Sequence, residues 1–174
     1  ADWRSGYSML DEEGKLIRKL DTATYYMSFN RDSAVYFSVM GIKGKPGWSA
    51  IDINEKVLFA VMNQSYGEPT PDYLIENKIR IEDAAGKIGY ANELGEIIIE
   101  PKFEMGTVFN KGKAIVAFGC EKVPWGNHED EDGCHHFSLV CKSFRAINLK
   151  GKYISEASSS FETLAKNINW ENPE

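Results

Sequence analysis

The chain has 174 residues, of which 43% are hydrophobic and 12% are aromatic, and this length fits a single domain that buries roughly 70% of its unfolded surface. Its formal net charge of -6 argues against a nucleic-acid backbone or an anionic membrane as the partner, because both need a concentrated basic surface. The sequence contains no run of about 18 apolar residues, so it predicts no membrane-spanning helix.

The first residue is Ala1 and not methionine. Removal of a secretory signal peptide at a small residue would produce this start, and so would a cut tag or a fragment boundary. Together with the cysteine placement described below, this start leads us to expect a periplasmic or secreted protein whose signal peptide was removed before Ala1.

The first 46 residues predict a strand over residues 33–40, which alternate and are rich in β-formers, followed by a loop over residues 41–47. Three tyrosines precede or lie in this strand: Tyr25, Tyr26 and Tyr36. They could form an aromatic surface for a sugar or a peptide. Packing between neighbouring sheets is the more common role of such residues, and we favour it.

Residues 63–72 hold two prolines and a glycine. This composition predicts an exposed loop, which is a secondary candidate for partner contact because function concentrates in loops on a rigid scaffold. Residues 79–82 then alternate between apolar and polar, as a half-buried strand does.

Residues 87–116 predict two hairpins in series. The first turns at a polar group that ends in Gly95, and the second turns at residues 110–112. Pro101 interrupts the intervening strand and is expected at a strand end or a sheet edge, where its missing N–H costs no ladder hydrogen bond.

The first of these turns recurs along the chain. Residues 7–15, 48–56, 88–96 and 144–152 match position for position, each with a large apolar residue first and Asp or Asn fifth. The second turn recurs as well, with Asp32, Asn77 and Gly112 at one equivalent position, and these residue types tolerate a left-handed backbone. The chain therefore divides into repeat units over about residues 4–46, 47–86, 87–143 and 144–170.

This pattern resembles the WG-repeat (KWG-repeat) proteins of bacteria, whose unit approximates W-G-Y-I-D-x-x-G-K-x-V-I, a Pro/aromatic segment, and F-x-x-G-x-A-x-V. No copy keeps the Trp-Gly pair, since Trp48 is followed by Ser49. The resemblance implies a β-repeat scaffold and no shared active site. It covers roughly residues 6–116 and 144–154, and is carried most fully by Lys87, Ile88, Gly89, Tyr90, Gly95, Pro101, Phe103, Phe109, Gly112 and Ala114.

An insert over residues 120–136 stretches the third unit, between predicted strands at 114–118 and 137–141. An antiparallel hairpin would place Cys120 and Cys134 near its two strand ends, so we predict a disulfide between them and a buried thiol at Cys141. A bond between Cys134 and Cys141 is the main rival, because sequence does not fix connectivity.

Three kinds of chemistry suit this insert. A metal site could use ligands from the set His128, Asp130, Asp132, Cys134, His135 and His136, but their spacing matches neither a paired-cysteine zinc site nor an EF-hand. A nucleophilic Cys134 with His135 or His136 lacks a group that orients the base. A protein-contact loop would use an apolar anchor and an acidic run, and we predict that its contact residues are Trp125, Asn127, His128, Glu129, Asp130, Glu131 and Asp132. A merely solvated charged loop is the competing interpretation.

The last 31 residues begin a fourth copy without completing it. Ser159 lies three residues before Glu162, a capping-box spacing that predicts a short helix or turn, followed by a frayed tail.

The predicted fold is all-β, with about four units of antiparallel hairpins arranged as a small propeller or as an open, twisted solenoid. Closure into a ring would require the N-terminal segment to complete the last unit.

These observations predict a non-catalytic exported protein that binds another protein, most concretely an inhibitor or immunity-type protein that blocks a secreted or toxin enzyme with the 120–136 loop. We expect no catalytic residue, metal or cofactor, because the hydrolase, metalloprotease, phosphate-loop and dinucleotide signatures are all missing. The alternatives are a cell-surface module that binds peptide or glycan and, less favoured, a metal-dependent hydrolase.

Overall fold

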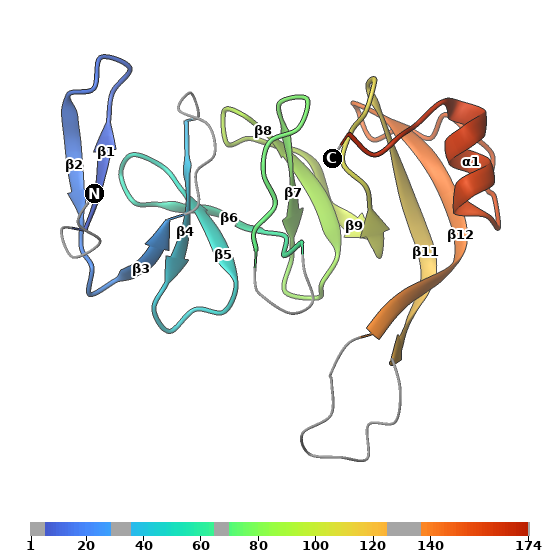
Figure 1. Ribbon diagram of the computed structural model, residues 1–174, viewed down its shortest axis with the longest axis horizontal. Coiled ribbons are helices and arrows are strands. Elements are labelled where there is room, and N and C mark those ends of the chain that lie inside the picture. The colour runs from blue at the N-terminus through green and yellow to red at the C-terminus, as the bar shows by residue number, and fades with distance from the viewer. Residues whose placement is uncertain (1–5, 29–35, 65–69, 125–136, 174) are drawn as a thin grey trace.

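The computed structural model describes residues 6–28, 36–64, 70–124 and 137–173 (Figure 1), and these residues form β-strands and one short C-terminal helix. The predicted all-β class is therefore confirmed. The strands and the helix are β1 (Tyr7–Leu10), β2 (Leu16–Leu20), β3 (Tyr25–Ser28), β4 (Ser38–Ile42), β5 (Trp48–Ile51), β6 (Val57–Val61), β7 (Lys78–Glu82), β8 (Ile88–Asn92), β9 (Ile97–Phe103), β10 (Met105–Gly106), β11 (Lys113–Pro124), β12 (Phe137–Asn148) and α1 (Phe161–Ile168).

The sheets follow one another along the longest axis of the molecule (Figure 1). β1 and β2 form a two-stranded sheet at one end, β3 to β9 form a seven-stranded antiparallel sheet in sequence order, and β10 to β12 form a three-stranded sheet at the other end. The N-terminal β1 pairs with β2 and does not complete the last unit. The described strands thus form an open row, which is the second of the two predicted arrangements.

Each predicted copy of the first turn folds in the same way. In every copy the side-chain oxygen of the Asp or Asn accepts hydrogen bonds of 2.8–3.1 Å from the backbone N–H groups two and four residues further on. This Asx turn closes the hairpin without tertiary help. The turns begin at Asp11, Asp52, Asn92 and Asn148, and an additional copy that was not predicted begins at Asp83.

The fourth residue of each Asx turn has a positive φ, and in the turns that begin at Asp52, Asn92 and Asn148 it contacts the preceding unit. A Cβ at Gly95 would lie 2.7 Å from Leu58 Cδ1, and one at Gly151 would lie 3.1 Å from Ile99. In the second unit this position is Glu55, with φ of 64°, whose carboxylate accepts hydrogen bonds from Arg18 (2.9 Å) and Tyr25 (3.1 Å). These three Asx turns therefore join one unit to the next.

The second repeated turn is also as predicted where the structure describes it. Asn77 has φ of 59° and Gly112 has φ of 72°, so both are left-handed. The Glu76 carboxylate accepts hydrogen bonds from the backbone N–H groups of Lys111 and Gly112, which links the two turns directly. The third copy, at Asp32, lies outside the described residues.

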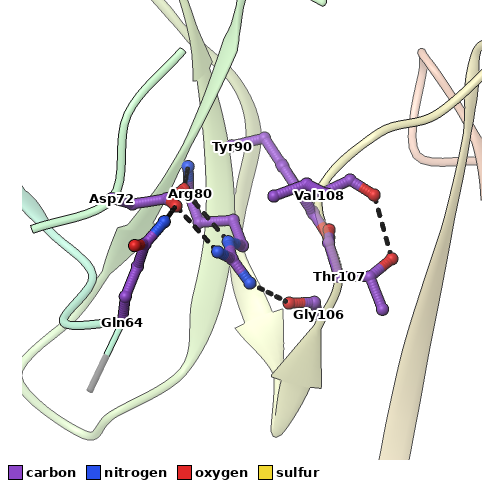
Figure 2. Close-up of polar contacts among 7 residues, drawn as sticks. All are labelled: Gln64, Asp72, Arg80, Tyr90, Gly106, Thr107 and Val108. Atoms are coloured by element: carbon purple, nitrogen blue, oxygen red, sulfur yellow. Dashed lines mark hydrogen bonds and ion pairs between the residues drawn. The ribbon is translucent and has the colours of Figure 1, made fainter. Parts of the chain in front are cut away.

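A buried polar network ties the loop before β7 to the next unit (Figure 2). The Arg80 guanidinium donates to both Asp72 carboxylate oxygens, at 3.0 and 2.7 Å, and to the Gly106 carbonyl at 3.2 Å. Asp72 also accepts from Gln64 Nε2 at 2.7 Å. The side chains of Asp72 and Arg80 are only 1% and 14% exposed, so this pair is held away from water.

Tyr90 extends the same region toward β10. Its side chain is buried, and its hydroxyl donates a 2.8 Å hydrogen bond to the Thr107 carbonyl. Burial raises the pKa of this hydroxyl far above its ordinary value, so Tyr90 stays protonated and remains a donor.

Several predictions of local structure need correction. The predicted strand 33–40 begins only at Ser38 in the part that the structure describes, because Tyr36 and Phe37 form a bend. Of the three tyrosines, Tyr25 is buried as predicted, whereas Tyr26 and Tyr36 are exposed. Pro101 is confirmed at a sheet edge, since β9 is the last strand of the seven-stranded sheet.

The C-terminal helix exists, but its cap is Ser160 and not Ser159. The Ser160 hydroxyl accepts from the Thr163 N–H, three residues into the helix. The predicted frayed tail is wrong, at least as far as Trp170. That side chain is buried, and its Nε1–H donates to the Val108 carbonyl at 3.2 Å, because its ring fills the space between α1 and the last sheet.

We predict that Asp72→Ala lowers the free energy of unfolding by about 3–5 kcal/mol, because it leaves the buried Arg80 guanidinium without its carboxylate. The matched control is Arg18→Ala, which removes the exposed pair with Glu55 and should lower the free energy of unfolding by no more than about 1 kcal/mol. Urea denaturation measures both. Equal losses would show that the Asp72–Arg80 pair does not hold the units together.

A second prediction concerns the junctions between units. Gly95→Ala and Gly14→Ala both place a side chain at φ near +80°, but only the first adds a contact, with Leu58. We expect about 1–2 kcal/mol of destabilisation at Gly14 from the backbone alone, and a further 1–3 kcal/mol, roughly, at Gly95 from overpacking. Thermal unfolding of the two variants gives the difference, and identical shifts would contradict the proposed junction.

Candidate functional site

The hairpin of β11 and β12 is an enlarged copy of the hairpin of β7 and β8. Lys113 pairs with Asn148 and Ala117 with Phe144, as Lys78 pairs with Asn92 and Glu82 with Ile88. In the smaller hairpin the Asx turn at residues 83–87 closes the strands. Residues 118–143 take the place of that turn in the larger one, so the insert is wider than the predicted 120–136.

The added strand segments extend past the rest of the row. β11 and β12 continue in register to a pair between Pro124 and Phe137, and Figure 1 shows this part of the hairpin projecting below the sheets, while α1 lies beside the opposite part of β12. Val123 and Val140 on the projecting part are exposed. We call residues 118–124 and 137–143 the stem.

A disulfide between Cys120 and Cys141 closes the base of the stem. The predicted bond between Cys120 and Cys134 is therefore wrong, and Cys141 is not a free thiol. The reason is the register: the strands run on beyond Cys120, so its cross-strand partner is Cys141, with a Cα–Cα distance of 3.9 Å. Over a sequence separation of 21 residues, the chain-entropy model gives such a bond roughly 3 kcal/mol of stabilisation.

Glu104 fastens the base of the stem to the neighbouring chain segment. Its carboxylate accepts a 2.6 Å hydrogen bond from the Cys120 N–H and lies 3.5 Å from Lys87 Nζ. The hydrogen bond from the Cys120 N–H is the largest cause that lowers the pKa of Glu104. Desolvation opposes it, and the charge of Lys87 adds a smaller lowering contribution. The ionised carboxylate thus orients the stem.

The outer stem carries paired charges and an aromatic contact. Glu121 and Lys142 form a 2.8 Å ion pair that lowers the pKa of Glu121 and raises that of Lys142. Lys122 Nζ lies 4.6 Å from the centre of the Phe137 ring. Exposed ion pairs add little stability, so the Glu121–Lys142 pair contributes little to holding the stem together.

The residues predicted to make partner contact lie outside the described residues. They are Trp125, Asn127, His128, Glu129, Asp130, Glu131 and Asp132, and the same is true of Cys134, His135 and His136. The structure does fix where their segment leaves and rejoins the stem, at Pro124 and Phe137, which lie opposite each other. Within residues 6–28, 36–64, 70–124 and 137–173, no cluster of three His, Cys, Asp or Glu side chains could hold a metal ion.

The secondary candidate loop at residues 63–72 has a different role at its described end. Pro71 and Asp72 are buried, and Asp72 belongs to the network with Arg80. This pair was not predicted from the sequence, because Arg80 alternates with Ile79 and Ile81 as an exposed residue of a half-buried strand would. A lone Asp after Pro71 carried no signal for its partner.

Residues 88–119 match the family model described as WG containing repeat. This segment runs from the start of β8 to the base of the stem, and the resemblance to WG-repeat proteins is confirmed over it. No curated protein and no solved structure matches the chain. In the described part of the chain, α1 is too short to cross a membrane.

The contact between Glu104 and Cys120 predicts a pH dependence. Because the folded-state pKa of Glu104 is lowered, its contribution to stability is present above the pKa of the unfolded chain and is lost as the pH falls through the folded-state value. Glu104→Gln should therefore lower Tm near neutral pH and lose this effect between about pH 5 and about pH 3. The control is Glu100→Gln at an exposed position of β9; a pH-independent difference for Glu104→Gln would contradict the assignment.

Proposed function

We propose that this protein is a non-catalytic, exported protein-binding module that contacts its partner through the β11–β12 extension. Its most concrete form is an inhibitor or immunity-type protein that covers the active site of a secreted or toxin enzyme. The observation that carries the proposal is the disulfide-braced stem, which replaces a short Asx turn at the same place in the repeat.

The stem suits a binding element on energetic grounds. A contact loop loses conformational entropy on binding, and a preorganised loop loses less of it. The Cys120–Cys141 bond, the Glu104 contact and the continued strand register all act on the base of the stem before any partner is present. They reduce the entropic cost of binding at the segment between Pro124 and Phe137.

The chemistry of the partner follows from the sequence of that segment. The four consecutive acids at 129–132 and the net charge of -6 suit a basic surface, since opposite charges accelerate encounter. Trp125 supplies an apolar side chain of the type that dominates binding energies when it fills a pocket. An enzyme that binds an anionic substrate would present such a basic, recessed surface.

The disulfide of the stem supports the proposal that the protein is exported. A disulfide at the base of the stem is compatible with the periplasm or the extracellular space, where such bonds persist. In a reducing compartment the same two thiols would leave the stem without its covalent brace. The proposed inhibitor therefore works where its stem is oxidised.

Exposed tyrosines favour a second candidate, a module that binds peptide or glycan along the repeat row. Tyr26 and Tyr36 are both exposed. The Tyr26 ring, however, covers Gly41 so closely that a Cβ there would lie 2.5 Å from it. A ring that shields a strand glycine has a structural role, which leaves less of this surface for a ligand.

The proposal is tested with the full chain as bait in a periplasmic or secreted fraction of the source organism. The comparison variant replaces residues 122–139 by Asn-Gly, which can close a two-residue hairpin between the paired Glu121 and Val140 and leaves the Cys120–Cys141 pair in register. We expect the intact chain alone to recover a specific enzyme and to inhibit it. Equal recovery by both forms would exclude the extension as the contact element.

With the recovered enzyme in hand, the residues are tested singly. Trp125→Ala and neutralisation of the acids at 129–132 should each weaken binding by about tenfold or more, while Tm stays nearly unchanged. The charge control is Glu12→Gln with Glu13→Gln, in the β1–β2 turn at the opposite end of the row (Figure 1). An equal loss of binding in the control would reduce the effect to net charge.

A further inference from the structure

Exposed apolar side chains recur at the Asx turns, where a solvated loop would carry polar residues. The turns that begin at Asp52, Asn92 and Asn148 each expose one large apolar residue inside the turn and another directly after it. Single exposed apolar residues are common on protein surfaces, whereas a repeated set at matching positions indicates a contact surface. The set is 39–48% exposed and consists of Ile53, Val57, Leu94, Ile97, Leu149 and Tyr153.

The Asx turns of the third and fourth units are neighbours. A Cβ at Gly151, in the fourth-unit turn, would lie 3.1 Å from Ile99, which follows the third-unit turn in β9. Figure 1 shows both turns on the side of the row that faces away from the stem. We call residues 92–97 and 148–153 together the turn surface.

The two halves of the turn surface carry opposite charges. Residues 92–97 are acidic and residues 148–153 are basic. Neither lysine of the basic half forms an ion pair with a described residue. The turn surface therefore presents apolar side chains between two charged patches of opposite sign, which are Glu93 with Glu96 and Lys150 with Lys152.

A second copy of this chain, turned by a two-fold rotation, fits both halves at once. In such a pair the acidic half of each copy faces the basic half of the other, because a two-fold interface is self-complementary. A partner of one charge would be attracted by one half and repelled by the other. A two-fold axis through the third-unit turn would place Glu96 opposite Glu96, so the axis has to pass between the two turns.

We propose that the protein forms a two-fold dimer through the turn surface, with the acids of each copy against the lysines of the other. The contact buries Leu94, Ile97, Leu149 and Tyr153 of both copies. These side chains are fewer than the roughly 20 residues that each side of a standard interface contributes, so the dimer is weak and reversible. Both stems face away from the contact (Figure 1), and the inference is independent of the proposed function.

Sedimentation equilibrium of the full chain over a range of concentrations measures the dimer. We expect a monomer–dimer equilibrium that weakens at high salt. Lys150→Glu with Lys152→Glu should weaken dimerisation by about tenfold or more, because each acidic half then meets acids. The matched control is Lys43→Glu with Lys45→Glu, which reverses the same Lys-Gly-Lys sequence in the β4–β5 turn on the stem side of the row and should leave the dimer unchanged.

Mixing two reversed variants separates a lost contact from a lost fold. Glu93→Lys with Glu96→Lys should also weaken the homodimer, because each basic half then meets lysines. An equimolar mixture of this variant with the variant that carries Lys150→Glu and Lys152→Glu should form a heterodimer, in which every acidic half again faces a basic half. A chain with all four reversals should regain the homodimer, whereas a misfolded variant would not be repaired by mixing.

A pair of apolar substitutions tests the same register without changing charge. Leu94→Asn should weaken the dimer by about tenfold, because the two-fold axis removes a buried Leu from each copy. Ile53→Asn is the matched control, since Ile53 is 47% exposed and Leu94 is 48% exposed. The Asx turn that contains Ile53 lies outside the turn surface, so this control should leave the dimer unchanged.

Three results would overturn the proposed dimer. The first is a chain that stays monomeric up to about 1 mM. The second is a dimer that charge reversal in the turn surface leaves intact, or that only replacement of residues 122–139 by Asn-Gly removes, which would place the contact at the stem. The third is a monomeric chain that captures a different protein and loses it with Leu94→Asn, which would assign the turn surface to another partner.

Discussion

The Asx turn is the interaction on which the whole row depends. One side-chain oxygen holds two backbone N–H groups, which fixes a tight hairpin from local sequence alone. The same geometry forces a positive φ three residues later, and the small residue at that point can then approach the preceding unit closely, as Gly95 approaches Leu58. Because a Cβ would prevent this approach, glycine here serves both the turn and the junction. Glu55 is the informative exception, since it accepts the unfavourable backbone and makes the junction with its carboxylate instead.

This dual role explains where the extension sits. The Asx turns at Asn92 and Asn148 contact the preceding unit, so residues inserted there would separate the units. The turn at Asp83 lies at the other end of its hairpin, and a Cβ at Gly86 would meet only Glu82 of its own strand, at 3.6 Å. Residues can therefore be inserted at the equivalent position of the next unit without disturbing a junction. An insert between Ala117 and Phe144 leaves every described strand pair of the repeat in register, and a surface element can be added without disturbing the scaffold.

The sequence predicted those turns and strands whose conformation is determined by residues close together in the chain. The Asp/Asn and Gly spacing identified the turns at Asp11, Asp52, Asn92 and Asn148, and the alternation of residues 79–82 identified β7, because both signals act within a few residues. The partner of Cys120 was mispredicted because it depends on how far β11 and β12 stay paired, which is a tertiary property. Arg80 was read as solvent-facing because its partner, Asp72, comes from an irregular loop with no periodicity. Ser160 displaced Ser159 as the helix cap for a similar reason: Ser158 is engaged in a bridge with Phe144, which sets where the helix begins.

The exposed groups of the stem determine how it could recognise a partner. At the stem, recognition would rely on side chains, because the strands are already paired with each other and the exposed groups are charges and valines. A backbone-driven surface tolerates sequence change in the partner, whereas a side-chain-driven surface discriminates between related partners. Under the proposed function, the stem would therefore favour one specific target, while the repeat scaffold beneath it stays unchanged.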